Sequence, residues 1–146
     1  MIPIEIPHPG FKRVGEQMRE AVARNSSDMA FTRGWSMQRV FEYIEALPYL
    51  EDSMLVDPQT EVIGGPRSFV GLPGIDCKKK AVMVACWARE NGIPWHFVAV
   101  DDTGLGISHV FAEVFDSGQW VSMDCTIRGI FKPGSAMPTV ERAVLI

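Results

Sequence analysis

The sequence predicts one α+β domain, with helices in its first half and an antiparallel sheet in its second. Apolar residues recur at helical spacing before residue 50, and apolar and polar residues alternate on both sides of a turn near residue 118. Between these parts, an apolar run has helix start and stop signals at its ends. A chain of 146 residues that is 47% apolar and 22% charged fits a single core over residues 1–146.

The first fifty residues are predicted to be helical after a proline-rich extended lead-in, Met1–Gly10. One helix is expected over about Phe11–Ala23. The polar break Asn25–Asp28 can cap a second helix, over about Met29–Leu47. Its apolar residues recur at helical spacing: Val40, Phe41, Ile44 and Leu47. The next segment, Pro48–Pro73, is rich in Gly, Pro and Asp, which predicts an irregular connection that can wall a site.

The most apolar segment, Ala81–Ala88, has no polar face, so periodicity alone leaves a helix and a buried strand both open. The ends of the segment favour the helix. Asp76 is a suitable N-cap, and Gly92 followed by Pro94 is a typical stop signal. We therefore predict a buried helix over Cys77–Asn91.

Cys77 would open this helix, where unpaired backbone N–H groups and the helix dipole favour an anion such as a thiolate. The basic run Lys78–Lys80 opposes the usual charge preference of a helix start. A solvated edge could tolerate the lysines, or they could favour a thiolate or an acidic substrate, and a simple exposed basic turn is an equal alternative. At about 100° per residue, Cys86 points away from Cys77, which predicts a structural Cys86.

The second half of the chain is predicted to form strands. Trp95–Val100 is a short apolar run, and apolar and polar residues alternate in Ile107–Phe115. A turn at Asp116–Gln119 leads into a partner strand, Trp120–Thr126. The tail Ala143–Ile146 is expected to be a final strand, with a docking peptide as the alternative.

The turn fixes which residues of the hairpin face one another. If Ser117–Gly118 is the tip, or if the loop has four residues and is symmetric, His109 and Asp124 are diagonal neighbours on one face. Their side chains are then within hydrogen-bonding reach. A bulge would shift this register. The same register places Cys125 on the apolar face, as a structural residue.

Cys77, His109 and Asp124 have the order and local settings of a thiol nucleophile, its base and the orienter of that base. A lone strand histidine or buried cysteine is usually structural, and only the conjunction favours catalysis. From the residues alone, both assignments stay open. Metal binding by Cys77 and His109 is a weaker alternative, because no other ligand has suitable spacing, and no metal or cofactor is expected.

Composition excludes several other classes of protein. A net charge of −4 argues against a nucleic-acid-binding surface, and no apolar stretch has the length of a membrane span. The N-terminus lacks the features of a secretory signal. The three cysteines fit neither a disulfide framework nor a CxxC zinc site, which favours a reducing compartment. A cytoplasmic location is expected, unless the chain is a processed fragment or is exported inside a larger assembly.

Four linked motifs lie between about Pro73 and Thr126. They are Cys77 with Ala81; Gly92, Ile93 and Pro94; His109 with Phe111, Glu113 and Val114; and Trp120 with Asp124 and Thr126. Together they resemble the transglutaminase-like superfamily, which has a papain-like core and a Cys-His-Asp triad. The sequence departs from the family pattern at five positions outside the triad: Ile75, Lys78, Lys79, His96 and Cys125.

The resemblance implies a papain-like catalytic core over residues 73–126, in which a buried helix packs on an antiparallel sheet. In this core, Cys77 is the nucleophile, His109 the general base and then acid, and Asp124 the orienter of the imidazole. Glu113 and Trp120 are expected to be mainly structural supports. The candidate substrate-binding residues are Trp95, Phe111 and Trp120.

The expected activity is hydrolysis of an amide, in a peptide, an isopeptide or a glutamine side chain, through a thioester on Cys77. The alternative is a phage virion or assembly protein that keeps this fold with little or no turnover. A loose resemblance of Asp57–Arg67 to phage-encoded and prophage-encoded members suggests it. The expected partners are a protein or peptide substrate or, for the alternative, virion and assembly proteins, with a virion-associated location.

Overall fold

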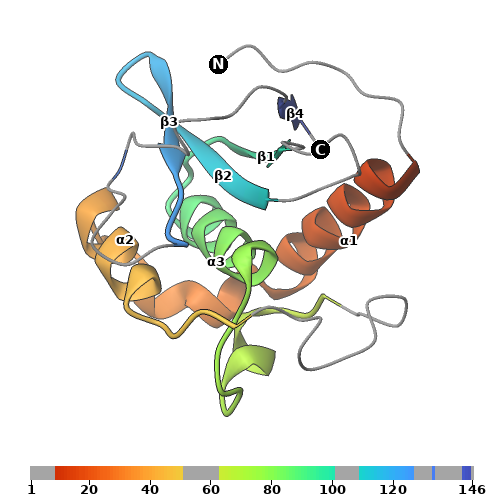
Figure 1. Cartoon of the computed structure of the whole chain (residues 1–146). Coiled ribbons are helices and arrows are strands. Elements are labelled where there is room, and N and C mark those ends of the chain that lie inside the picture. The colour runs from red at the N-terminus through yellow and green to blue at the C-terminus, as the bar shows by residue number, and fades with distance from the viewer. Residues whose placement is uncertain (1–8, 51–62, 101–108, 127–132, 134–142, 146) are drawn as a thin grey trace.

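The computed structural model describes residues 9–50, 63–100, 109–126, 133 and 143–145. The predicted lead-in before Pro9 and the start of the strand predicted from Ile107 lie outside these residues, as does most of Asp57–Arg67. In the described part, helices pack around a central helix, α3, and an antiparallel sheet covers one side of it (Figure 1). The predicted α+β class is confirmed.

The first helix, α1, spans Pro9–Asn25 and contains the predicted segment. The single helix predicted over Met29–Leu47 is wrong. The chain instead forms a 3₁₀ helix, η1 (Ser26–Thr32), and a separate helix, α2 (Met37–Glu45). Gly34 separates the two, because its φ of 81° lies in the left-handed region and ends the helical path.

Helix α2 begins at its own cap. The side chain of Ser36 accepts the backbone N–H of Arg39 at 3.1 Å, which satisfies one donor of the first turn. The predicted apolar face is present, since Val40, Phe41 and Ile44 are buried. The described part of the connection that follows contains a short 3₁₀ helix, η3 (Pro66–Phe69).

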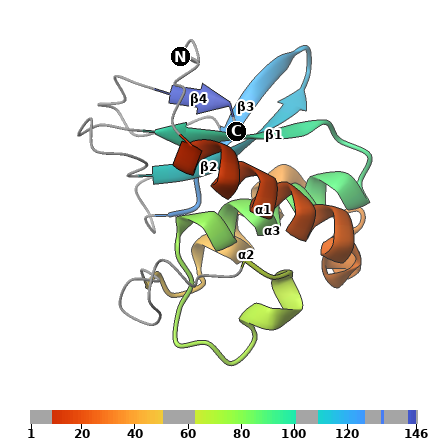
Figure 2. The same ribbon diagram turned by 90° about the vertical axis from the view of Figure 1, so that its right-hand side faces the viewer.

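Helix α3 spans Cys77–Glu90, almost as predicted. The carboxylate of Asp76 caps it by accepting the backbone N–H of Lys79 at 3.0 Å. Gly92, with a φ of 68°, follows its end, and Ile93 donates its backbone N–H to the carbonyl of Ala88 at 2.8 Å. The helix has no polar face over Ala81–Ala88 because it is enclosed by the sheet and by α1, η1 and α2 (Figure 2).

The described sheet has the strand order β3-β2-β1-β4. Its strands are β1 (Trp95–Val100), β2 (His109–Asp116), β3 (Gln119–Met123) and β4 (Ala143–Leu145). All neighbouring strands are antiparallel. The prediction that the tail forms a strand is confirmed for Ala143–Leu145, which pairs with β1.

The hairpin of β2 and β3 has the predicted register, in which Phe115 pairs with Trp120. Its tip is Ser117–Gly118, and both residues have positive φ, 52° and 81°. Such a two-residue turn matches the twist of the flanking strands. The predicted register is therefore confirmed, and no bulge shifts it within the paired residues of β2 and β3.

The two faces of the sheet have different neighbours. One face packs on α3 in the main core, and the buried Cys86 and Cys125 belong to this core, as predicted. The other face carries His109 with a small separate cluster of Val98, Val100 and Phe111. Thus the candidate histidine lies on the face opposite the main core.

Candidate active site

Cys77 is the first residue of α3 and lies directly after the N-cap Asp76. It packs against the edge of the main core and keeps part of its surface exposed to solvent. At the first turn of a helix, several backbone N–H groups have no partner within the helix. The thiol thus lies at a helix end where backbone dipoles stabilise negative charge.

His109 and Asp124 meet across the hairpin. His109 is the first residue of β2, and Asp124 directly follows β3. The distance between His109 Nε2 and Asp124 Oδ2 is 2.7 Å. The His109 side chain is only 7% exposed and that of Asp124 is fully buried. The predicted hydrogen bond between the two side chains is therefore confirmed.

The other oxygen of the Asp124 carboxylate is also satisfied. Asp124 Oδ1 accepts the backbone N–H of Thr126 at 3.3 Å and the hydroxyl of the same residue. A buried carboxylate is costly unless its oxygens have such partners. Thr126, which belonged to a motif without a role of its own, thus fixes the orientation of Asp124.

The pKa of His109 is raised to about 10. Burial of the ring lowers this pKa. Hydrogen bonds and charge interactions with Asp124 and Cys77 raise the pKa by more than burial lowers it. Since Nε2 is bonded to Asp124, Nδ1 is the ring nitrogen available to the thiol of Cys77. Cys77, His109 and Asp124 thus form one interacting series, in which both neighbours of the imidazole favour its protonated form.

The other two cysteines have a different environment. Both are fully enclosed in the core. Burial, followed by nearby negative charges, raises the pKa of the Cys86 thiol to about 12. Burial likewise raises the pKa of Cys125. Of the three cysteine residues, only Cys77 is partly exposed.

The basic run after Cys77 is not the exposed turn that we considered from the sequence. Lys78 Nζ lies 2.7 Å from one oxygen of the Asp76 carboxylate, and Lys79 Nζ lies 3.9 Å from the other. Lys80 is buried, and its ammonium contacts backbone carbonyls. The lysines are therefore tolerated at a helix start because Asp76 and these carbonyls bind their charges.

The three candidate substrate-binding residues lie in different places. Trp120 is 44% exposed on the hairpin, so it can contact a substrate. Phe111 is buried and offers no free surface, and we assign it a packing role. Trp95 packs against the main core and contacts Phe97, with ring centroids 5.1 Å apart.

A second pair of polar side chains was missed by sequence reasoning. His96 Nε2 lies 2.6 Å from Glu113 Oε1, and the ring of His96 lies 4.0 Å from that of Trp120. His96 and Glu113 face each other in the register of β1 and β2. Pairing those two strands in the sequence would have revealed the contact. Trp120 thus packs on this pair and keeps part of its surface exposed.

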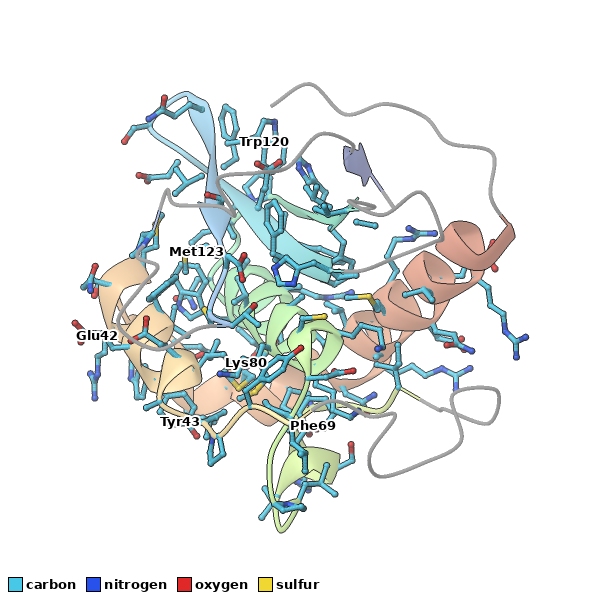
Figure 3. All side chains as sticks on the ribbon, viewed as in Figure 1. Glu42, Tyr43, Phe69, Lys80, Trp120 and Met123 are labelled. Carbon is cyan, nitrogen blue, oxygen red and sulfur yellow. The ribbon has the colours of Figure 1, made fainter. Side chains whose placement is uncertain are left out.

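The described part of the molecule also contains an apolar cavity of about 250 Å³. It lies between η1, α2, η3 and α3, and its lining includes Met29, Tyr43, Phe69 and Met83. No residue of the Cys77–His109–Asp124 series lines it. Figure 3 shows Tyr43 and Phe69 on the far side of α3 from Trp120.

The described residues contain no group of at least three His, Cys, Asp or Glu side chains placed to hold a metal ion. None of their helices has the length and apolar character needed to cross a membrane.

Comparisons with known proteins concern the fold. Neither protein-family models nor curated proteins gave a match to the sequence. Among solved structures, the chain is similar to a putative cysteine protease from Cytophaga hutchinsonii, with a TM-score of 0.52 and 13% sequence identity. The alignment covers 86% of this chain and 46% of that one, so the chain spans about half the length of that protein. The two proteins share the α+β fold.

Proposed function

We propose that this chain is a cysteine-dependent acyl-transfer enzyme with a papain-like, transglutaminase-like core. The observation that carries the proposal is the series from Cys77 through His109 to Asp124, with the thiol at a helix N-terminus and the carboxylate fully buried. The arrangement of a Cys-bearing helix on a His-bearing antiparallel sheet supports the fold. So does the likeness to a protein described as a cysteine protease.

The charges of the site suit a nucleophilic thiol. An imidazolium at His109 next to Cys77 favours the thiolate over the neutral thiol, as does the helix dipole. Asp124 is the orienter, because it fixes the ring and stabilises its positive charge. The same proton on His109 is then available for the leaving group.

The proposed reaction begins with attack of the Cys77 sulfur on an amide carbonyl carbon, which forms a tetrahedral intermediate. His109 donates its proton to the departing amine nitrogen, the C–N bond breaks, and a thioester remains on Cys77. Neutral His109 then takes a proton from water, which attacks the thioester and releases the carboxylic acid. The backbone N–H of Cys77 is the proposed donor to the oxyanion.

The proposed substrate is a protein or peptide, and the amide belongs to its backbone, an isopeptide bond or a glutamine side chain. Hydrolysis is preferred over transfer to an amine, since no feature of the sequence indicates a dedicated amine site. The alternative, a virion or assembly protein with the same fold, predicts a thiol at Cys77 of ordinary reactivity.

The test is the rate of iodoacetamide alkylation against pH, followed by intact and peptide mass spectrometry. The proposal predicts fast labelling of Cys77 well below the usual titration range of a thiol, and loss of this low-pH rate in His109→Ala. Cys77→Ser serves as the control for site assignment. Slow labelling of Cys77 that does not depend on His109 would exclude the enzyme and favour the structural alternative.

A further inference from the structure

The ammonium of Lys80 is buried next to the candidate site. The residue is 2% exposed, and its Nζ contacts three backbone carbonyl oxygens, those of Leu47 at 2.9 Å, Cys125 at 3.0 Å and Glu45 at 3.3 Å. An ammonium has three hydrogens to donate, so these carbonyls can satisfy it completely. A buried ammonium costs much free energy unless it is hydrogen-bonded, and here three carbonyl oxygens bind it.

The position of Lys80 links the parts of the candidate site. Lys80 lies three residues after Cys77 on α3, which is about one turn along nearly the same side of the helix. One of its partners, the carbonyl of Cys125, belongs to the residue directly after Asp124. The other two lie at the end of α2 and just beyond it, and Figure 3 shows Lys80 on the side of α3 that faces α2.

We propose that Lys80 is a positioning residue of the catalytic series: it anchors the backbone after Asp124 to the helix that carries Cys77. The proposal rests on the proposed function, because it concerns how that series is held together. One helix then supplies both the nucleophile and the anchor of the carboxylate. Lys80 thereby holds Cys77 and Asp124 at fixed positions relative to His109, which lies between them in the series.

Two independent features support this role. Asp124 directly follows the last residue of β3, so the strand ladder does not hold its backbone, and a contact beyond the ladder is needed. The second feature is charge. Although burial lowers the pKa of Lys80, its charge interacts favourably with the negative groups nearby, which include Glu45 and Asp124. Lys80 thus also places a positive charge near the carboxylate of Asp124.

The test compares wild type with Lys80→Gln, whose amide is neutral and can donate to no more than two of the three carbonyls. Ring titration of the histidines is followed by NMR, together with the pH dependence of Cys77 alkylation. His96 is an internal reference, because it pairs with Glu113 and not with Asp124. Val22→Ala, a core substitution in α1, is the control for a general loss of stability.

Loss of the Lys80 charge alone would raise the pKa of His109, whereas displacement of Asp124 would lower it. A positioning role therefore predicts a fall in the titration midpoint of His109 by roughly one pH unit, with His96 unchanged. Cys77 labelling at low pH should fall about tenfold in the same variant. Val22→Ala should lower the melting temperature but leave unchanged both the titration midpoint of His109 and the labelling of Cys77 at low pH. A folded Lys80→Gln protein with the wild-type titration of His109 overturns the proposal, as does an equal shift of both histidines.

If Lys80→Gln does not fold, Lys80→Arg replaces it. A planar guanidinium cannot reproduce the arrangement of three carbonyls around an ammonium, so a smaller shift confined to His109 is expected. An unmoved His109 overturns the proposal. If wild type itself lacks His109-dependent labelling of Cys77, the proposed function fails and this proposal fails with it. If wild type shows His109-dependent labelling and the Lys80 variant keeps the wild-type titration of His109, only the proposal about Lys80 fails.

Discussion

His109 and Asp124 are 15 residues apart in the chain, and their side chains meet at 2.7 Å because the turn between them has only two residues at its tip. The carboxylate is fully buried and both of its oxygens have hydrogen-bond partners, and its contact with the imidazole helps to raise the pKa of His109. The hairpin therefore delivers an oriented, charged imidazole to the thiol of Cys77.

Asp124→Asn should keep the shape of the orienter and remove its charge. Without the carboxylate, burial of His109 is no longer opposed by its strongest favourable contact, so its pKa should fall. We expect Cys77 alkylation near pH 6 to slow by about tenfold or more. The measurement is the pH profile of labelling in both proteins. An unchanged profile would mean that Asp124 does not act through His109.

Stability should decrease at alkaline pH. The pKa of His109 is raised from 6.5 to about 10 in the folded protein, so its contribution is fully present below pH 6.5 and is lost as the pH rises toward 10. The loss should be on the order of 3 kcal/mol in the free energy of unfolding. Urea unfolding at pH 6 and pH 9.5 measures it. His109→Gln should show a clearly smaller difference between the two pH values.

At the tip of the hairpin, substitution of Gly118 should lower the stability of the protein, whereas substitution of Ser117 by glycine should not. A Cβ at Gly118 would meet no atom within 4 Å, so Gly118→Ala tests the φ of 81° alone. It should cost about 1 kcal/mol of stability. Ser117→Gly, at a φ of 52°, should be neutral or slightly stabilising. Thermal unfolding of the two variants checks this, and equal shifts would contradict the turn geometry.

Asp76→Ala should destabilise the protein by about 1–2 kcal/mol, because it removes the N-cap of α3 and a carboxylate that contacts two lysines. The matched control is Ser36→Ala at the exposed N-cap of α2, which should cost less. Chemical denaturation measures both free energies. A larger loss in the Ser36 variant would refute this ranking.

Cys86 should resist alkylation in the native protein. Its thiol is fully buried, and burial, with nearby negative charges, raises its pKa to about 12. At pH 9, iodoacetamide should therefore label Cys86 only after denaturant is added, as peptide mass spectrometry would show. Native labelling of Cys86 at a rate near that of Cys77 would mean that α3 opens readily.

Local signals in the sequence could predict much of the site. The two ends of α3 have capping residues, Asp76 and Gly92, and the hairpin has a turn that fixes its register. Cap and turn preferences depend on a few adjacent residues. For this reason, both the place of Cys77 and the contact between His109 and Asp124 could be derived without a structure.

Other features depend on contacts between distant parts of the chain. The partners of Lys80 lie 33 to 45 residues away, so its sequence neighbours left open a solvated edge, an effect on a thiolate or an acidic substrate, and an exposed basic turn. The break between η1 and α2 was missed because apolar spacing continues across it. There, one glycine with positive φ outweighed the periodic pattern. Phe111 was predicted to bind substrate, but its side chain is buried with Val98 and Val100.

The burial of α3 on all sides has a consequence for dynamics. A helix enclosed by the sheet and by other helices can expose its amides only when the domain opens as a whole. Its hydrogen exchange should therefore be among the slowest in the chain. Cys77 is the first residue of this helix and keeps its place only while the helix is folded, so thermal inactivation should coincide with global melting of the protein.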